Sequence, residues 1–209
     1  MDRAIISRTE KEAKEHVILQ NLDTSFQKID ELPFDFERRR MSVIVKDDSN
    51  VVSMVTKGAL EEMLTISTHV EYRGEIIPIT ESIRQEVLAE VGQLNRQGLR
   101  VLGVGYKSGL REDYAYAVTD ESDMILTGYL AFLDPPKPSA APAIQALLEH
   151  GVRTKILTGD NEKVTQAICE KVGLDVEQML LGADIDQMTD QELAEAVESV
   201  TVFAKLSPD

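Results

Sequence analysis

The residues best suited to chemistry in this chain lie in the run KILTGDN at positions 155–161. We expect an apolar strand to end at Leu157, Gly159 to let the backbone turn, and a helix to follow. Free amides at the start of such a helix form an anion site, for which phosphate is a natural ligand. Thr158 can donate its hydroxyl to a phosphoryl oxygen, and Asp160 can hold Mg²⁺ or its water shell. A tight turn followed by a helix cap explains the same residues equally well.

A second set of residues combines aromatic rings with positive charge. Phe34 precedes three consecutive arginines at positions 38–40, the dense basic cluster of an acidic chain. A purine nucleotide needs a flat apolar surface for its base and cations for its phosphates. Lys57 is expected at the end of a neighbouring strand, where Gly58 permits close backbone approach. Each residue also has a plain structural interpretation, with Phe34 in a core and the cations on the surface.

Composition limits the possible functions. The 209 residues are 43% hydrophobic and 28% charged, which is typical of a globular protein, and no apolar run is long enough to span a bilayer. The formal charge of -15 argues against a nucleic-acid surface, because a polyanion requires a basic field. Three scattered histidines indicate no transition-metal site. The lone Cys169 excludes an internal disulfide and is expected in a core.

The elements expected before residue 128 are helices mixed with hairpin-like strands. Helices are predicted from 10 to 20, around Leu60, Met63 and Leu64, and from an N-cap at Thr80 to a stop at Gly98. Strands are predicted at 41–45, 51–56, 70–72, 75–79, 100–106 and 124–132. This order indicates an α+β domain with an antiparallel sheet and flanking helices.

From residue 133 onward the pattern changes to βα alternation. A helix from Ser139 should direct Ile144, Leu147 and Leu148 inward, and a strand at 152–157 should lead to a helix ending at Gly173. Strands at 178–181 and 200–204 and a capping box at 189–192 complete a parallel α/β pattern. These strands are few for a complete doubly wound domain, so we expect the chain to be part of a longer protein. The prolines of LDPPKP at 133–138 indicate a stiff connector.

Taken together and in order, these motifs resemble the P-type cation-transporting ATPases from end to end. The motifs are Phe34 with MSV at 41–43, KGA at 57–59, LRVL at 99–102, DPPK at 134–137, TGDN at 158–161 and VFAKLSP at 202–208. The run GYLAFLDPPK at 128–137 is most similar to the bacterial magnesium-transporting subgroup. The resemblance implies a nucleotide-binding domain at 1–127 and, at 128–209, part of a haloacid-dehalogenase-like, Rossmann-like phosphorylation domain. That part would lack the nucleophile strand and the C-terminal magnesium-binding segment.

The resemblance also assigns roles within the first domain. Phe34 would stack on adenine, and Arg39 would be a positively charged residue of the pocket. Lys57, with Gly58, would line the adenine cavity, and Asp23 would lie where a carboxylate faces the base. ATP, as its Mg²⁺ complex, would be the ligand.

The remaining roles belong to Arg100 of the first domain, to the connector and to the second part. Arg100 would contact the phosphates, and Asp134 with Lys137 would lie at the interface that the nucleotide bridges. Thr158 and Asp160 would belong to the phosphorylation site. The partners would be the rest of the pump, namely the phosphorylation, actuator and membrane domains, at the cytoplasmic face of the cell membrane. Nucleic acid and direct membrane insertion of this soluble fragment are not expected.

Departures from the family pattern refine this prediction. Phe36 stands where some relatives carry a phosphate-binding arginine, and Leu60 replaces a proline after KGA. The sequence contains neither DKTGT, whose aspartate accepts the phosphoryl group, nor the GDGxND segment that holds catalytic Mg²⁺. We therefore expect the fragment to bind ATP without hydrolysing it. The alternatives are a haloacid-dehalogenase-like phosphatase, although residues 1–30 contain no Asp-x-Asp, and a non-catalytic interaction module.

Overall fold

The computed structural model describes residues 25–208, so the predicted helix at 10–20 and Asp23 lie outside the described residues. The described chain forms two compact units. Unit 1 holds residues 25–84 and 102–132, and unit 2 holds residues 85–101 and 133–208. In neither unit does the described chain contain a helix of the length and apolarity needed to cross a bilayer.

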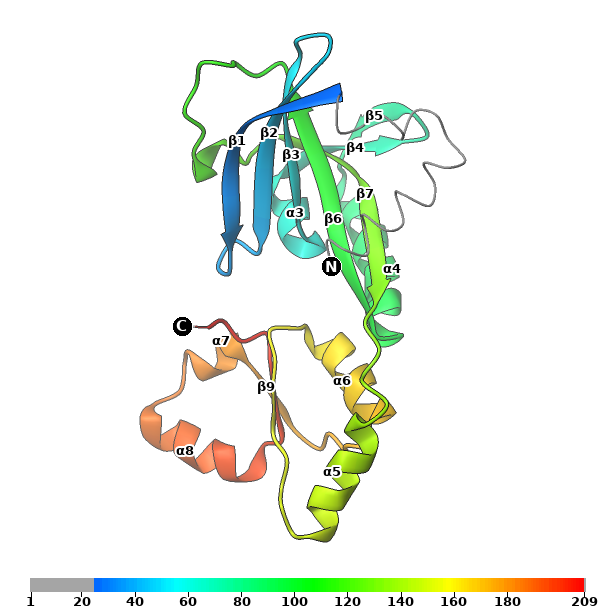
Figure 1. The fold of residues 1–209 in the computed structure, drawn as a ribbon, viewed down its shortest axis with the longest axis vertical. Coiled ribbons are helices and arrows are strands. Elements are labelled where there is room, and N and C mark those ends of the chain that lie inside the picture. Colours follow the sequence, from blue (N-terminus) through cyan, green and yellow to red (C-terminus); the bar gives the residue numbers. More distant parts are fainter. Residues whose placement is uncertain (1–24, 209) are drawn as a thin grey trace. The chain divides into compact units, whose positions relative to one another are not determined.

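A seven-stranded sheet dominates unit 1 (Figure 1). Its strand order is β1-β2-β3-β6-β7-β4-β5. The strands are β1 (Phe26–Asp35), β2 (Arg40–Asp47), β3 (Val52–Ala59), β4 (Ser67–Tyr72), β5 (Glu75–Pro78), β6 (Leu99–Ser108) and β7 (Met124–Leu133).

The antiparallel sheet predicted from the sequence is wrong in one respect, because the sheet is mixed. β4 runs parallel to β7, with Val70 opposite Leu126, whereas β1, β2, β3 and β6 form an antiparallel series. A parallel pair requires a long crossover, and the segment between β4 and β7 is long enough to provide one. β1 was not predicted at all; its mixed charged sequence and two register shifts against β2 hide the alternation expected of a strand.

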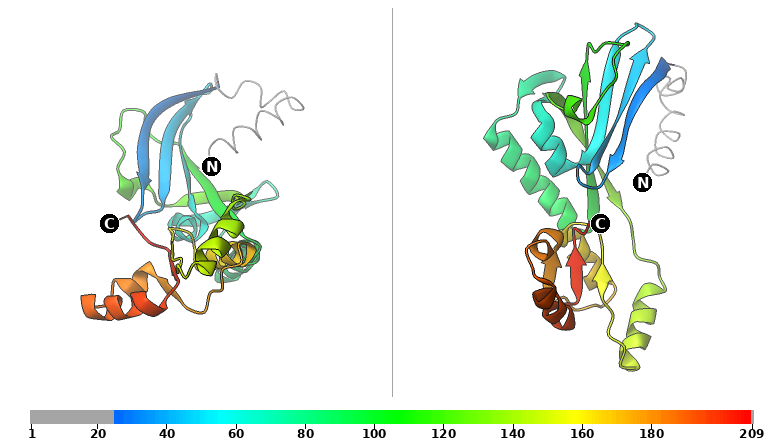
Figure 2. Two further views of the ribbon diagram at one scale, coloured as in Figure 1. Left: turned by 60° about the horizontal axis from the view of Figure 1, so that its bottom comes forward. Right: turned by 90° about the vertical axis from the view of Figure 1, so that its left-hand side faces the viewer.

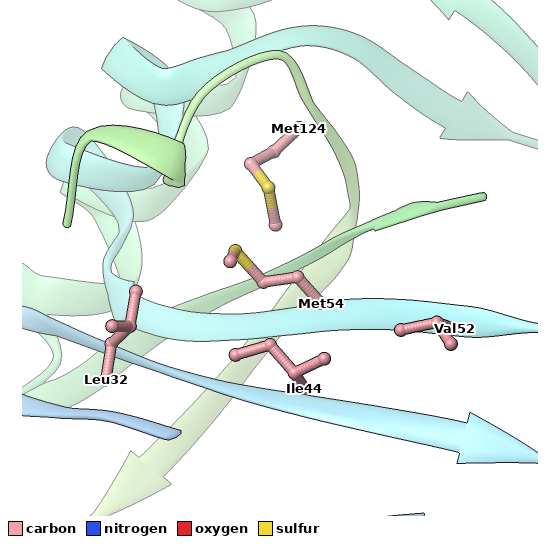
Figure 3. Packing of buried hydrophobic residues seen from close by; sticks show 5 residues of the cluster. All are labelled: Leu32, Ile44, Val52, Met54 and Met124. Atoms are coloured by element: carbon pink, nitrogen blue, oxygen red, sulfur yellow. The ribbon is translucent and has the colours of Figure 1, made fainter. Parts of the chain in front are cut away.

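The faces of the sheet differ in burial. Residues of β3 alternate strictly between buried and half-buried, as expected when one face covers a core. The buried cluster is made by Leu32, Ile44, Val52, Met54 and Met124. Figure 3 shows Met54 and Met124 directed toward each other within it. We call this side the core face of the sheet and the opposite side its outer face.

Helix α3 (Leu60–Ile66) covers the core face. Leu60, Met63 and Leu64 are buried, which confirms the prediction of a short helix with these apolar residues. The helix packs closely on β6, because a Cβ built at Gly103 would lie 3.0 Å from the side chain of Met63. A short 3₁₀ helix, η2 (Val118–Asp120), precedes β7.

Helix α4 (Glu81–Arg96) begins and ends where the sequence predicts. Its first turn is capped by Thr80, whose hydroxyl accepts a hydrogen bond from the Ile83 amide at 3.3 Å. Gly98 follows with a φ of 83°, a conformation that favours glycine after a helix.

Unit 2 has a three-stranded parallel sheet in the order β8-β10-β9 (Figure 2). Its strands are β8 (Ile156–Leu157), β9 (Met179–Leu181) and β10 (Val202–Ala204), and its helices are α5 (Ala140–Glu149), α6 (Glu162–Lys171), α7 (Gly182–Ile185) and α8 (Asp190–Ser199). The core contains Cys169, Val172, Leu174 and Val202. The parallel pattern and the buried cysteine are thus confirmed.

Two expectations for unit 2 are wrong. The strand predicted at 152–157 is reduced to Ile156 and Leu157, and Leu157 is 69% exposed because β8 lies at the edge of the sheet. Leu147 and Leu148 are exposed as well. The first part of α5 provides the contact with the core, through Ala140, Ala141 and Ile144.

Candidate functional site

Strand register brings four of the predicted site residues to one end of the sheet in unit 1. Asp35 at the end of β1 pairs with Arg40 at the start of β2, and Arg40 pairs with Gly58 near the end of β3. Phe34, Arg39, Lys57 and Gly58 therefore lie in three adjacent chain segments. We call this end of the sheet the ring and cation site.

The turn between β1 and β2 is built around Asp35. Its carboxylate oxygen Oδ1 accepts hydrogen bonds from the amides of Glu37 and Arg38, both at 2.9 Å, and its carbonyl accepts one from the Arg39 amide at 2.7 Å. The hydrogen bond from the Arg38 amide is the main cause of a lowered pKa of the Asp35 carboxyl, and desolvation has a smaller, opposing effect. Arg39 ends the turn with a φ of 49°. The backbone at Arg39 is thus fixed in an uncommon conformation.

Phe34 lies on the surface of the ring and cation site. It is 50% exposed, which rules out the alternative that this ring is a core residue. Its neighbour is Phe36, with the ring centroids 5.1 Å apart and the planes at 88°. Such an edge-to-face contact restrains a ring that solvent can still reach.

Gly58 lies against the backbone of β2. A Cβ built on it would be 2.5 Å from the Cβ of Arg40 and 2.7 Å from the carbonyl oxygen of Arg39. The next amide, of Ala59, donates to that same carbonyl at 3.0 Å. The close approach expected at this glycine is therefore present, and the neighbour is the strand that carries the arginines.

Lys57 lies on the outer face of the sheet, because strand residues alternate and its neighbours Thr56 and Gly58 are buried. It pairs across the strands with Met41 on one side and Val104 on the other. The same face continues along paired positions of β2, β3 and β6. The resulting set, which we call the outer apolar strip, is half-buried and consists of Met41, Val43, Val55, Val104 and Tyr106.

On the core face, sequence reasoning missed a buried ionic network centred on Glu121. The side chain of Glu121 is 0% exposed, and its Oε2 accepts hydrogen bonds from Arg38 Nη1 at 2.6 Å and Arg40 Nε at 2.8 Å. Its Oε1 accepts one from Ser42 Oγ at 2.7 Å, and Ser42 Oγ lies 2.7 Å from Thr56 Oγ1. Two of the three arginines thus belong to a structural network, which corrects the view of the cluster as a solvated surface feature.

The network keeps Glu121 ionised. Burial alone would raise the pKa of this carboxyl, but the hydrogen bonds from Arg38, Ser42 and Arg40 outweigh burial and lower the pKa below its ordinary value of 4.5. No local motif pointed to Glu121, because its partners are 79 to 83 positions away in the sequence.

In unit 2, Arg100 joins two of the predicted residues. Its Nη1 lies 2.9 Å from Asp134 Oδ2, and its Nη2 lies 2.7 Å from Asp160 Oδ2. The Nε atom of Arg100 is buried and has no hydrogen-bond partner. Arg100, Asp134 and Asp160 therefore form an ion triad. The guanidinium of Arg100 is therefore occupied by two carboxylates.

The run at 158–161 forms a hydrogen-bonded turn and a helix cap. Thr158 Oγ1 accepts from the Asp160 amide at 3.1 Å, and Asn161 Oδ1 accepts from the Val164 amide at 3.0 Å at the start of α6. Gly159 lies in a bend of the chain, as expected, but does not use a conformation that glycine alone favours. It does not have a positive φ, and the segment is held through bonds from Lys205 and Leu206 to the carbonyls of Asp160 and Thr158. The Asn161 cap leaves fewer free amides for an anion than the sequence suggested.

Lys137 is exposed in the connector, where its carbonyl accepts from the Ala140 amide at 2.9 Å. Among residues 25–208, no group of three or more His, Cys, Asp or Glu side chains is arranged to hold a metal ion. The carboxylate of Asp160, which the sequence offered to Mg²⁺, is paired with Arg100 instead.

Comparison with known proteins decides the family. Residues 2–139 match the family model described as "P-type ATPase, cytoplasmic domain N". The chain belongs to the P-type ATPase family. The ring and cation site, the outer apolar strip and the Glu121 network all lie within the residues that the domain N model covers.

Curated P-type ATPases align with the whole chain. It is 45% identical over 208 residues to "Magnesium-transporting ATPase, P-type 1" of Salmonella typhimurium and 44% identical to the protein of that name from Escherichia coli, covering 100% of the chain in both cases. It is 31% identical over 194 residues, 90% of the chain, to "Calcium-transporting ATPase 1" of Bacillus cereus. The chain spans only 22%, 23% and 21% of these three relatives, so it corresponds to about a fifth of a P-type ATPase.

Proposed function

We propose that this chain is the ATP-binding cytoplasmic portion of a magnesium-translocating P-type ATPase and that ATP binds at the ring and cation site. The observation that carries the proposal is the half-exposed ring of Phe34, which lies one short turn from Arg39 at the sheet end that also holds Lys57. The magnesium-transporting activity comes from the printed names of the relatives that match the chain over its whole length.

The chemistry of this end of the sheet suits a purine nucleotide. Phe34 offers an accessible aromatic face for the base, and the outer apolar strip lies beside Lys57 on the paired strands. Arg39 offers a guanidinium group for the phosphates. Mg²⁺ is expected to arrive with the phosphates of ATP.

Arg100, Asp134, Lys137, Thr158 and Asp160 have a separate role in this proposal. Residues 128–209 would be part of a haloacid-dehalogenase-like phosphorylation domain, and residues 1–127 would be the nucleotide-binding domain. The parallel strands of unit 2 and the position of Thr158 and Asp160 directly after β8 support this assignment. Arg100 would exchange its carboxylate partners for a phosphate. The aspartate that accepts the phosphoryl group would come from a DKTGT segment that this sequence does not contain.

The function is tested by titrating the 209-residue chain with ATP, ADP and GTP by calorimetry or by NMR. We expect weak binding with preference for adenine nucleotides. Phe34→Ala should abolish nearly all of this binding, because the ring supplies the stacking surface. Phe26→Ala is a matched control, since Phe26 is 48% exposed and lies at the other end of β1.

Three results would contradict the proposal. Equal affinities of the wild type and Phe34→Ala would remove the ring from the site. Equal loss in Phe34→Ala and Phe26→Ala would indicate a general effect of exposed rings in β1. Turnover of ATP or of p-nitrophenyl phosphate by the chain alone would contradict the expectation that it binds without hydrolysis and would favour the phosphatase alternative.

A further inference from the structure

The Glu121 network connects the core face of the sheet to the turn that carries the ring and cation site. Arg38 and Arg40 flank Arg39, and both donate to the same carboxylate oxygen of Glu121. Arg38 also donates through Nη2 to the carbonyl of Pro33 at 2.8 Å, directly before Phe34. One buried carboxylate therefore holds the residues on both sides of Arg39 and, through Arg38, the backbone beside Phe34.

Glu121 is itself held firmly in place. Lys107 on β6 donates through Nζ to the carbonyl of Asp120 and, at 3.1 Å, to that of Ser122, so the ammonium group bridges the residues on either side of Glu121. The Ala117 amide donates to the Asp120 carboxylate at 2.8 Å, which closes the preceding 3₁₀ turn. The loop thus presents Glu121 to the sheet with a defined backbone.

The energetics favour a rigid arrangement. A buried carboxylate without partners would be costly, and here each oxygen has donors within 2.8 Å. The Arg38 and Arg40 side chains are only 17% and 13% exposed, so water cannot readily replace Glu121 as their partner. Loss of the carboxylate would leave two guanidinium groups in competition for the remaining acceptors and would loosen the turn between them.

We infer that Glu121 is a positioning residue for the nucleotide site, which sets the backbone of residues 34–40 so that Phe34 and Arg39 are arranged for the base and phosphates before ATP arrives. This inference rests on the proposed function. Glu121 does not touch the ligand, because it lies on the core face while Lys57 and the outer apolar strip lie on the opposite face. Its contribution is preorganisation, which improves affinity by reducing the ordering required on binding.

The test compares Glu121→Gln with the wild type in the 209-residue chain at a temperature where both are folded, as judged by circular dichroism. Two measurements are made. Hydrogen exchange reports on the Arg39 and Ala59 amides, which donate to Asp35 and Arg39 and close the site. Calorimetry gives the dissociation constant for MgATP. We expect faster exchange at both amides and an approximately tenfold weaker affinity for MgATP.

Glu112→Gln is the matched control, because Glu112 also pairs with a cation, Lys46 at 2.6 Å, but is exposed. It should change neither measurement. Glu121→Asp keeps the charge but shortens the side chain. Its affinity for MgATP should therefore lie between those of the wild type and Glu121→Gln.

The outcomes separate the inference from the proposed function. If the wild type does not bind MgATP, the proposed function fails, while exchange at Arg39 and Ala59 still reports on the network. If the wild type binds and Glu121→Gln binds equally well with unchanged exchange, the positioning role is overturned. A lower melting temperature with an unchanged affinity of the folded variant would reduce Glu121 to a purely structural residue and would also overturn the inference.

Discussion

Gly58 on β3 lies so close to Arg40 on β2 that a Cβ placed on the glycine would be 2.5 Å from the Cβ of the arginine. This approach joins the KGA motif to the arginine cluster. The residue type at position 58 is therefore determined by the neighbouring strand, and the same contact fixes the backbone that carries Arg39.

Gly58→Ala is expected to destabilise the chain by about 2 kcal/mol, because backbone atoms of β2 cannot move away without breaking the ladder. Urea unfolding measures the change. Gly159→Ala is the control. Its Cβ would meet only the Leu206 carbonyl, at 3.4 Å, and its φ is not positive, so its effect should be within about 1 kcal/mol of zero. An equal loss of unfolding free energy in Gly58→Ala and Gly159→Ala would contradict the close contact at Gly58.

Glu121→Gln is expected to lower the free energy of unfolding at pH 7 by about 3 kcal/mol, because it breaks a buried ionic network. The pKa of Glu121 in the folded chain is below its ordinary value of 4.5. The carboxylate therefore stabilises the fold fully above about pH 4.5, and this contribution disappears as the pH falls through the folded pKa. The difference between wild type and variant should be constant from about pH 7 to 5 and narrow at lower pH. A difference that widens on acidification would refute the assignment.

The two arms of the Arg100 ion triad should differ in strength. Asp160 is 23% exposed and Asp134 is 64% exposed. In double-mutant cycles with Arg100→Met, we expect a coupling free energy of about 1 kcal/mol with Asp160→Asn and below about 0.5 kcal/mol with Asp134→Asn, because water screens the exposed pair. Both couplings should weaken at high salt. A larger coupling free energy between Arg100 and Asp134 than between Arg100 and Asp160 would show that solvent exposure does not determine the strength of these ion pairs.

Asn161→Ala is expected to cost about 1 kcal/mol, because Asn161 Oδ1 caps the first turn of α6. Ser139→Ala tests another predicted helix start. Ser139 precedes α5 but makes no side-chain capping hydrogen bond, so its replacement should be nearly neutral. Thermal unfolding of the two variants measures both effects. Equal decreases in melting temperature for the two variants would contradict the capping role of Asn161.

Local features were the part of the fold that the sequence could predict. The hairpin between β4 and β5 turns at Arg73 and Gly74, both with positive φ, and the capping box of Thr189 and Glu192 opens α8 as expected. The core positions of α3 followed from apolar spacing. Each of these depends on residues within a few positions of one another, so a single sequence contains the necessary information.

Long-range features were not predictable in this way. The parallel pairing of β4 with β7 depends on segments about 55 residues apart, and no local pattern reports strand direction. Glu121 lies in a polar loop, where a glutamate is ordinary until its distant partners are known. Arg38 and Arg40 could not be distinguished from Arg39, because adjacent residues of one type look alike until the backbone assigns them to different faces.

The central pairing of the sheet also influences the order in which unit 1 can fold. β1, β2 and β3 are joined by short turns, whereas β3 and β6 bring together positions such as Ser53 and Ser108, which are 55 residues apart. Closing that long loop costs more chain entropy than closing the short hairpin turns. We therefore expect the three-stranded meander to form early and the docking of β6 to be the slower step. Since Lys107 on β6 holds the loop of Glu121, the turn bearing Arg39 acquires its final shape only after that late step.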